Sequence, residues 1–388
     1  MKRTTRSLYV GRHSDEYDGM VNLPVHKTTT VLFPTVDAFE RAQAPTYQGV
    51  RYGRSGTPTT FALQDAIALL EGAESAVALP SGLAAVTAAL LAQVSAGDHV
   101  LVTDNAFSRT RVFAQTMLPR FGVETTFFDP LDLDGLDALF RPTTRAILVE
   151  SPGSTTFEVA DLPTLARRAH ARGVRVLVDN TWSGSVFYQP LALGADLSIQ
   201  AASKYIVGHS DALVGIVAGS SESCLAVKQI AEQLGLAASP DACDLALRGL
   251  RTLDVRLARH QATGFTVARW LADRPEVERV LHPGLPSCPG HDVWKRDFTG
   301  ATGLFAIVLR DASHRRVAAM LDGMKLFGIG GGWGGFESLA MPANPSKSRT
   351  ARAWSQPEPL VRIHCGLEDP SDLLEDLERG LMLATGAP

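Results

Sequence analysis

The stretch that decides the fold reads Ser198-Ile199-Gln200-Ala201-Ala202-Ser203-Lys204-Tyr205-Ile206-Val207-Gly208-His209-Ser210-Asp211. An apolar, strand-like segment runs into Ser203-Lys204-Tyr205, and a glycine turn follows it. A lysine that ends such a strand is placed to form a Schiff base with a carbonyl compound. An isolated lysine at a strand end is more often a solvated side chain, so the rest of the chain has to decide between these two interpretations.

Upstream of this stretch, helical and strand-like segments alternate from about residue 60 to 215. Near-continuous apolar runs at 146–149 and 174–178 are typical of parallel strands that are covered on both faces. The alternation therefore predicts an α/β domain with a mostly parallel sheet. Further strands are expected at 76–79, 99–102 and 124–128, and helices at 61–71, 82–93 (with Ser81 as N-cap) and 107–121.

The pattern changes after about residue 220 and predicts a smaller α+β domain at the C-terminal end. The expected elements are a helical segment at 241–271, a Pro- and Gly-rich connection at 280–284, strands at 303–309 and 360–364, and helices at 315–321 and from Ser371 onward. The first 55 residues are rich in loop formers and resemble an arm that reaches over a neighbouring subunit. We therefore expect an arm at 1–55, a large cofactor-binding domain at 56–240 and a C-terminal domain at 241–388.

Composition excludes several classes of protein. The chain has 388 residues and a formal net charge of -4, which gives no electrostatic case for nucleic acid or an anionic membrane as partner. Met1–Arg6 is basic but lacks the apolar core of a signal peptide, and no apolar run approaches the roughly 18 residues that span a bilayer. Four scattered cysteines without a C-x-x-C pair argue against disulfides or a metal site and favour a cytoplasmic protein.

A carboxylate directly follows the apolar run at 174–178. This residue, Asp179, precedes Lys204 by one strand-like segment. Ligands of open parallel sheets bind beyond the carboxyl ends of the strands. A carboxylate there could hold the protonated ring nitrogen of pyridoxal 5′-phosphate (PLP), with Lys204 carrying the same cofactor. The alternative for Asp179 alone is a side chain that caps a loop.

Two segments could bind the phosphate of such a cofactor. Ser81-Gly82-Leu83 opens a helix, whose free N–H groups and positive dipole end suit an anion, although this arrangement is common in α/β proteins. Tyr52 and Arg54 offer a hydroxyl and a guanidinium near glycine turns; a plain surface turn is the alternative. Ser203 could supply one more hydroxyl.

Arg362 is expected to bind a substrate carboxylate. It lies in the apolar strand 360–364, so its guanidinium needs a buried anionic partner. A bidentate contact with the α-carboxylate of an amino acid would provide one, and a structural salt bridge to Asp or Glu is the alternative. We assign no chemical step to His209, His364 or Trp333, because such residues more often serve in packing.

Together these residues resemble the Cys/Met-metabolism family of fold type I PLP enzymes, and within it the cystathionine β-lyases. The likeness runs almost from end to end in ordered blocks. These blocks are Tyr52-Gly53-Arg54 with Gly56-Thr57, Glu150 to Ser154, Val178 to Trp182, Ser198 to Asp211, Arg248 to Leu253, Trp294 to Gly300, Trp333-Gly334-Gly335 with Glu337-Ser338, and Arg362 to Asp369.

The resemblance implies a large domain with a mostly parallel sheet of the seven-stranded type and a role for each matching residue. Lys204 would be the Schiff-base lysine and Asp179 the partner of the ring nitrogen. Ser81, Gly82, Leu83 and Ser203 would bind the phosphate, joined across a dimer interface by Tyr52 and Arg54, within a homotetramer built as a dimer of dimers. Phe107 would stack on the cofactor ring, and Arg362, Trp333, Gly332 and Ser154 would contact the amino-acid substrate.

Two departures from the family pattern bear on substrate choice. Phe107 stands where the family places an aromatic hydroxyl, so ring stacking is kept while a group worth about 10² to 10⁴ in rate is lost. Gly330-Gly331-Gly332 stands where lyases carry a Tyr-Ser pair before Trp333, which predicts a roomier and more flexible pocket. Both changes favour a specialised enzyme, acting on a bulkier or unusual sulfur amino acid.

Three functions remain open on the sequence. The first is C–S β-elimination on a cystathionine-like or cysteine-conjugate-like amino acid. The second is another PLP reaction on the same scaffold, such as γ-elimination, replacement, racemisation or C–C bond formation in secondary metabolism. Gly153-Ser154 resembles β-lyases more than γ-enzymes. The third is a regulatory protein that binds PLP without turnover, which the joint presence of Lys204, Asp179 and Arg362 disfavours.

Overall fold

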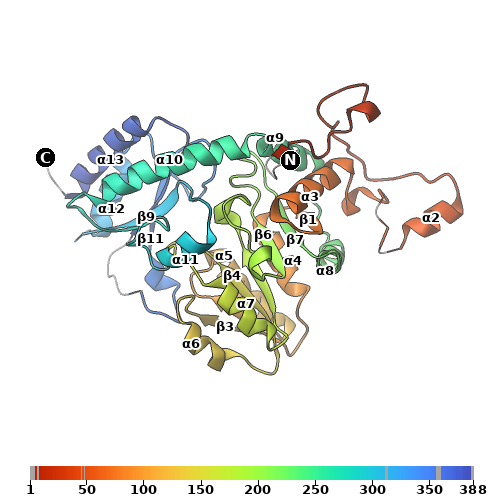
Figure 1. Cartoon of the computed structure of the whole chain (residues 1–388), viewed down its shortest axis with the longest axis horizontal. Helices are drawn as coiled ribbons and strands as arrows, with labels where there is room; N and C mark the ends of the chain where they lie inside the picture. The colour runs from red at the N-terminus through yellow and green to blue at the C-terminus, as the bar shows by residue number, and fades with distance from the viewer. Residues whose placement is uncertain are drawn as a thin grey trace.

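The computed structural model describes residues 5–6, 8–44, 46–47, 49–310, 313–354 and 360–385. Residues 1–4, which belong to the predicted basic N-terminus, lie outside these ranges. Two sheets organise the chain, one of seven strands and one of five, with helices packed around both (Figure 1). In the described part of the chain, no helix is both long enough and apolar enough to cross a membrane.

The seven-stranded sheet confirms the predicted α/β architecture. Its order is β1-β7-β6-β5-β4-β2-β3, and all neighbours are parallel except at β7, which runs antiparallel to β1 and β6. The strands are β1 Ser75–Leu79, β2 His99–Thr103, β3 Glu124–Phe128, β4 Thr144–Glu150, β5 Arg175–Asp179, β6 Leu197–Gln200 and β7 Gly215–Gly219. The sequence pattern did not predict β7, because it is a short run between two glycines just after the loop that follows Lys204.

Helices cover both faces of this sheet, as the apolar runs in its strands require. Ile147 and Val178 pack toward α7 (Leu162–His170), whereas Leu148 and Leu177 pack toward α4 (Gly82–Leu91) and α8 (Ser221–Gln233). A third group of helices covers the β1 and β7 end of the sheet. It consists of α3 (Pro58–Glu71) and α9 (Pro240–Leu250). Ser81 caps α4 as predicted, since its Oγ accepts the N–H of Ala84 at 3.1 Å.

Several predicted helices have different bounds in the structure. The segment expected as one helix at 107–121 divides into α5 (Ser108–Val112), a π-helical turn at 113–117 and a 3₁₀ turn at 118–121, where Pro119 has no N–H to donate. The segment at 241–271 divides into α9 and α10 (Leu253–Ala272). The helix expected at 315–321 is the longer α12 (His314–Gly323). Among the elements that the predictions missed are α7, α8, α11 (His291–Asp297) and β8 (Val277–Leu281), the last of which takes up part of the connection expected at 280–284.

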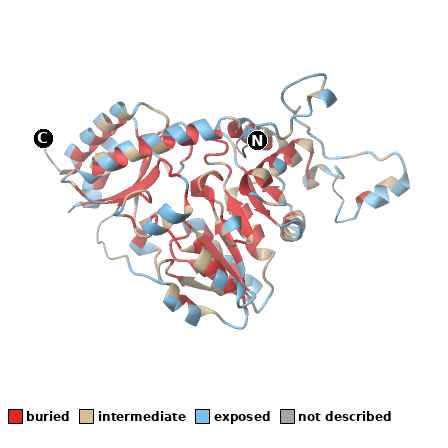
Figure 2. Cartoon of the chain, in the orientation of Figure 1, coloured by how far each residue is buried: buried red, intermediate tan, exposed pale blue. Residues whose placement is uncertain are grey.

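The five-stranded sheet joins the larger one through a shared core. Its order is β10-β11-β12-β9-β8, with β9 at Leu304–Leu309, β10 at Gly328–Ile329, β11 at Leu339–Ala343 and β12 at Leu360–His364. On β9, Leu304 and Ala306 pack into the core of the larger sheet, while Phe305 and Ile307 face α10, α12 and α13 (Pro370–Thr385). Figure 2 shows the buried strands of both parts meeting between the helices.

The N-terminal segment extends away from both sheets. Its helix α2 (Val36–Ala42) lies at the far end of a long excursion, and most of this excursion is exposed (Figures 1 and 2). Apolar side chains are among the exposed ones, including Leu32, which is 90% exposed, and Val36. All four cysteines of the chain are free and buried.

Candidate active site

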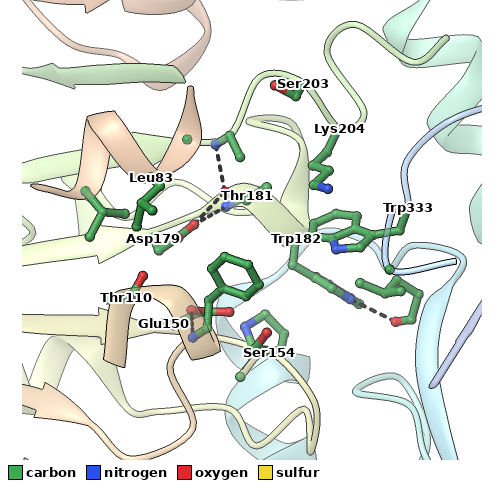
Figure 3. Close-up of a pocket in the computed structure, with 18 of the residues that line it drawn as sticks. Leu83, Thr110, Glu150, Ser154, Asp179, Thr181, Trp182, Ser203, Lys204 and Trp333 are labelled. Carbon is green, nitrogen blue, oxygen red and sulfur yellow. Dashed lines mark hydrogen bonds between the residues drawn. The ribbon is translucent and has the colours of Figure 1, made fainter. Parts of the chain in front are cut away.

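A cavity of about 240 Å³ opens at the carboxyl ends of β4, β5 and β6. This is the edge at which open parallel sheets bind ligands. Its walls come from both parts of the chain, since the α4 start and the strand ends face the first residue of β9 and residues that precede β11 (Figure 3). Of the predicted site residues, it is lined by Ser81, Gly82, Leu83, Phe107, Ser154, Asp179, Ser203, Lys204 and Trp333.

Lys204 projects into this cavity from the turn that follows β6 (Figure 3). Its Nζ lies 5.3 Å from the centre of the Trp333 indole ring. Burial, reinforced by the nearby Arg362 guanidinium, lowers the pKa of Lys204. A depressed pKa makes the neutral amine more available, which is what imine formation and proton abstraction both need.

The turn around Lys204 is held by close backbone packing. Gly334 has φ +87°, and a Cβ at this position would lie 2.8 Å from the carbonyl carbon of Lys204, so only glycine fits there. The Gly334 N–H is accepted by Nε2 of the buried His364 at 3.0 Å. The structural role expected for His364 is therefore a specific one, namely anchoring the loop that carries Trp333.

Asp179 lies at the end of β5, and Thr181 orients its carboxylate. Thr181 donates to Asp179 Oδ1 from its backbone N at 3.1 Å and from its Oγ1 at 2.5 Å. The same hydroxyl accepts the N–H of Ala201 at 2.9 Å, so it ties the Asp179 turn to the segment that leads to Lys204. Burial raises the pKa of Asp179. A protonated ring nitrogen is the kind of partner that would restore its charge.

The start of α4 provides an anion-binding surface. The N–H groups of Ala84 and Ala85 are taken by the side chain and carbonyl of Ser81, while those of Gly82 and Leu83 have no acceptor among the described residues. Gly82 lies so close to the Lys204 segment that a Cβ would approach that of Ala201 to 2.4 Å. This open helix end fits the phosphate of PLP.

Ser203 already has a partner. Its Oγ donates to the carbonyl of Val214 at 3.1 Å and accepts the N–H of Val214 at 2.8 Å. A phosphate contact from Ser203 therefore requires its hydroxyl proton to leave Val214, and its assignment to the phosphate stays a prediction.

Arg362 is buried without a carboxylate. In the described part of the chain it forms no ion pair with Asp or Glu, so the salt-bridge alternative finds no support there. Its Nη2 donates to the carbonyls of Gly331 at 2.7 Å and Gly332 at 3.3 Å. Burial lowers the pKa of Arg362 to about 10. A buried guanidinium that lacks an anion, beside the cavity wall at Gly331, fits a carboxylate ligand. Gly332 was predicted to contact the substrate, but it contributes only the second carbonyl that Arg362 contacts and does not line the cavity.

Glu150 is a cavity residue that the sequence interpretation missed. It ends β4 directly opposite Asp179 on β5, and its Oε2 accepts the N–H of Phe107 at 2.6 Å. Burial, together with repulsion from Asp179, raises the pKa of Glu150 well above its ordinary value. The strand-end rule that identified Asp179 applies equally to Glu150 and could have found it. Thr110, Thr181 and Trp182 also line the cavity and were not predicted.

Tyr52 and Arg54 lie away from the cavity of their own chain. Tyr52 is 47% exposed, and Arg54 donates to the carbonyl of Glu232 in α8 at 2.5 Å. Their predicted contact with a phosphate on a neighbouring subunit stays a prediction. Among the described residues, no group of three His, Cys, Asp or Glu side chains is arranged to hold a metal.

The chain is similar to known proteins along almost its whole length. Residues 4–382 match the family described as "Cys/Met metabolism PLP-dependent enzyme". The chain is 39% identical to cystathionine beta-lyase MetC of Escherichia coli, covering 98% of both chains. It is 38% identical to an L-alanine/L-glutamate racemase of Wolbachia pipientis, covering 98% of this chain and 97% of the other. The crystal structure of metB from Corynebacterium glutamicum superposes with a TM-score of 0.90 at 31% identity, covering 98% of both chains.

Proposed function

Because the chain belongs to the Cys/Met-metabolism family of PLP-dependent enzymes, we propose that it breaks the C–S bond of an S-substituted cysteine by α,β-elimination. The family, the PLP cofactor and the class of carbon–sulfur lyase are as the sequence predicted. The observation that carries the proposal is Arg362, a buried guanidinium without a carboxylate beside the cavity that holds Lys204. This pairing suits an α-amino acid whose carboxylate is bound and whose α-proton is removed.

Lys204 and Asp179 would hold the cofactor, with the phosphate at the N–H groups of Gly82 and Leu83. When bound, PLP supplies a sink for the electron pair left on the substrate α-carbon. Lys204 Nζ, as a neutral amine in the cavity, would remove the α-proton. The C–S bond then breaks, and the sulfur leaves as a thiolate that takes up a proton. The net reaction consumes one water and yields a thiol, pyruvate and ammonia.

The remaining side chains orient the substrate and exclude water. Arg362 binds its α-carboxylate, which directs the α-hydrogen toward Lys204. Phe107, Trp182 and Trp333 provide apolar walls, which strengthen each charged contact inside the cavity. Ser154 also lines the cavity, where its hydroxyl can contact a polar group of the substrate.

The substrate is proposed to carry a larger S-substituent than a compact lyase pocket admits. A Cβ at Gly331 would meet no other atom within 4 Å, so the space that a tyrosine side chain fills in related lyases is open. Phe107 adds apolar surface without a hydroxyl. These features favour a cysteine conjugate with an apolar leaving group over a compact, highly polar one.

Racemisation is the second candidate, and a specific observation favours it. A relative that matches nearly the whole chain is named an L-alanine/L-glutamate racemase. Removal of the α-proton by Lys204 is common to both reactions, and they differ in whether a β-substituent leaves. A protein that binds PLP without turnover has no observation in its favour.

The working enzyme is proposed to be a homo-oligomer in the cytoplasm, a dimer of dimers. Exposed Leu32, Val36 and Phe39 on the extended arm need a covering surface, and Tyr52 and Arg54 need a neighbouring phosphate. The four cysteines are buried as thiols, which suits a reducing compartment. A particle of monomer mass in light scattering would contradict the oligomer.

Product analysis tests the proposed function. The purified holoenzyme is incubated with S-benzyl-L-cysteine, L-cystathionine and L-alanine, and pyruvate, ammonia, thiol, 2-oxobutyrate and D-amino acid are measured. We expect pyruvate, ammonia and thiol in equal amounts, with the higher kcat/KM for S-benzyl-L-cysteine. Cystathionine cleavage as efficient as that of a housekeeping lyase would refute the specialised substrate, and D-alanine as the main product would favour the racemase.

A matched pair of variants tests the open space. Gly331→Tyr should lower kcat/KM for S-benzyl-L-cysteine by about tenfold or more, because its side chain fills the space proposed for the ring. The effect on S-methyl-L-cysteine should be smaller. Gly331→Ala adds only a methyl group and separates loss of space from loss of glycine flexibility. Equal losses for both substrates in Gly331→Tyr would show that the space does not set specificity.

A further inference from the structure

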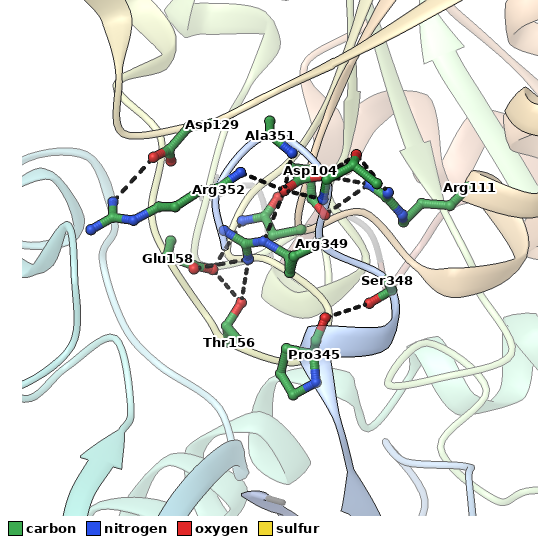
Figure 4. Close-up of polar contacts among 12 residues, drawn as sticks. Asp104, Arg111, Asp129, Thr156, Glu158, Pro345, Ser348, Arg349, Ala351 and Arg352 are labelled. Carbon is green, nitrogen blue, oxygen red and sulfur yellow. Dashed lines mark hydrogen bonds and ion pairs between the residues drawn. The ribbon is translucent and has the colours of Figure 1, made fainter. Parts of the chain in front are cut away.

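A cluster of buried, oppositely charged side chains lies outside the cavity wall, and Figure 4 shows its contacts. Asp104 forms ion pairs with Arg111 at 2.8 Å and with Arg349 at 3.2 Å, and Arg349 also pairs with Glu158 at 2.9 Å. None of these four side chains is more than 6% exposed. Two cations and two anions balance one another. Because buried ion pairs bring little net stability, their placement points to a role in fixing geometry.

Asp104 binds a short segment of the C-terminal half of the chain. Its carboxylate accepts the backbone N–H groups of Thr350 at 2.9 Å, Ala351 at 3.0 Å and Arg352 at 3.1 Å. The Thr350 hydroxyl adds a fourth contact at 3.0 Å. This segment lies between β11, which follows the Gly330–Gly332 loop, and β12, which carries Arg362. Asp104 itself precedes Phe107 by three residues.

Arg349 and Asn105 extend the contact to a second cavity loop. Arg349 Nη1 donates to Glu158 Oε1 and Thr156 Oγ1, each at 2.9 Å. Asn105 Nδ2 donates to Glu158 Oε2 at 3.3 Å, and the carbonyl of Asn105 accepts the Ser154 N–H at 3.0 Å. One guanidinium therefore joins the loop that carries Phe107 to the loop that carries Ser154.

We propose that Asp104 and Arg349 are positioning residues for the reaction, which act from outside the cavity by fixing the loops of Phe107 and Ser154 against the C-terminal segment 349–352. Neither residue is part of the described cavity wall. They hold together the Phe107 wall, the Ser154 wall and the segment 349–352, which lies in the connection between β11 and the strand β12 that carries Arg362. The catalytic part of this inference rests on the proposed function, and the geometric part does not.

The geometric part is tested on cofactor-free protein by hydrogen exchange and mass spectrometry. Arg349→Lys keeps the charge, but a single ammonium cannot reach Asp104 and Glu158 in the same fork geometry. We expect roughly tenfold faster exchange in peptides that cover 104–107 and 153–158, and unchanged exchange in β6. Arg352→Gln is the matched control, because Arg352 belongs to the same segment and its guanidinium pairs with Asp129 at 3.1 Å while being 56% exposed. Uniform acceleration across the chain, or none, would overturn the proposal.

The catalytic part is tested with PLP-loaded enzyme and S-benzyl-L-cysteine. Arg349→Lys should retain PLP and lower kcat by about 10- to 100-fold, since small displacements of positioned groups carry such costs. The double variant Arg349→Gln with Glu158→Gln keeps the charges balanced. Its unfolding temperature should recover to that of the wild type, but its kcat should stay as low as that of Arg349→Lys. Recovery of both would assign the cluster to charge balance alone and overturn the proposal. If wild-type enzyme cleaves no S-substituted cysteine, the proposed function fails while the exchange result still decides the geometric claim.

Discussion

At the scale of single residues, two carboxyl groups at neighbouring strand ends have different roles because they have different hydrogen-bond partners. Asp179 is oriented by Thr181 and faces the predicted position of the ring nitrogen, whereas Glu150 holds the backbone N–H of Phe107. Burial raises the pKa of both, and repulsion from Asp179 raises that of Glu150 further. We infer that the Glu150 carboxyl positions Phe107 and that its burial beside Asp179 favours the neutral form.

This inference predicts the pH dependence of stability in cofactor-free protein. A carboxyl whose folded pKa is raised stabilises the fold fully below its unfolded pKa, and this contribution is lost as the pH rises through the folded pKa. Glu150→Gln keeps an oxygen for Phe107 and cannot ionise. Its free energy of unfolding, measured by urea denaturation, should therefore exceed that of the wild type by a margin that grows as the pH is raised above the ordinary pKa of a glutamate. Glu124→Gln, at an exposed ion pair with Arg141, is the control. A difference that stays constant as the pH is raised would contradict the inference.

At the scale of elements, the N-terminus of α4 combines a helix cap with the proposed phosphate site. Ser81 caps the helix and leaves the N–H groups of Gly82 and Leu83 toward the cavity. The sequence was sufficient to predict this arrangement, because an N-cap serine after a short strand is a local signal. It was not sufficient for the helix at 107–121, whose division into three turns depends on packing around Pro119 and on the anchoring of Phe107 by Glu150.

Two cap variants separate stability from binding. Ser81→Ala and Ser220→Ala each remove an N-cap hydroxyl, from α4 and from α8, and each should cost about 1 kcal/mol of stability. Only Ser81→Ala should weaken PLP binding, by roughly 10-fold, because only α4 faces the cavity. Titration of cofactor-free protein with PLP measures this difference. Equal PLP affinity in the two variants would show that the N-terminus of α4 does not bind the phosphate.

At the scale of the whole molecule, the site is assembled from parts that are distant in the sequence. Lys204, Asp179 and Arg362 were predictable one by one, because each lies at a strand end or in an apolar strand. The link between Asp104 and Thr350 was not predictable, since no local pattern reports a contact between a strand end and a loop some 250 positions later. The same limit applies to Arg362, whose lack of a carboxylate partner only the three-dimensional arrangement reveals.

Identification of the lysine that carries PLP tests the account most directly. Sodium borohydride fixes PLP irreversibly to that lysine, and peptide mass spectrometry then locates the modified position. The chain has seven lysines, and among those that the structure describes Lys204 is the one that lines the cavity. We predict a single modified peptide containing Lys204, and no modification in Lys204→Ala. Modification of a different lysine, or persistence of the label in that variant, would contradict the central claim.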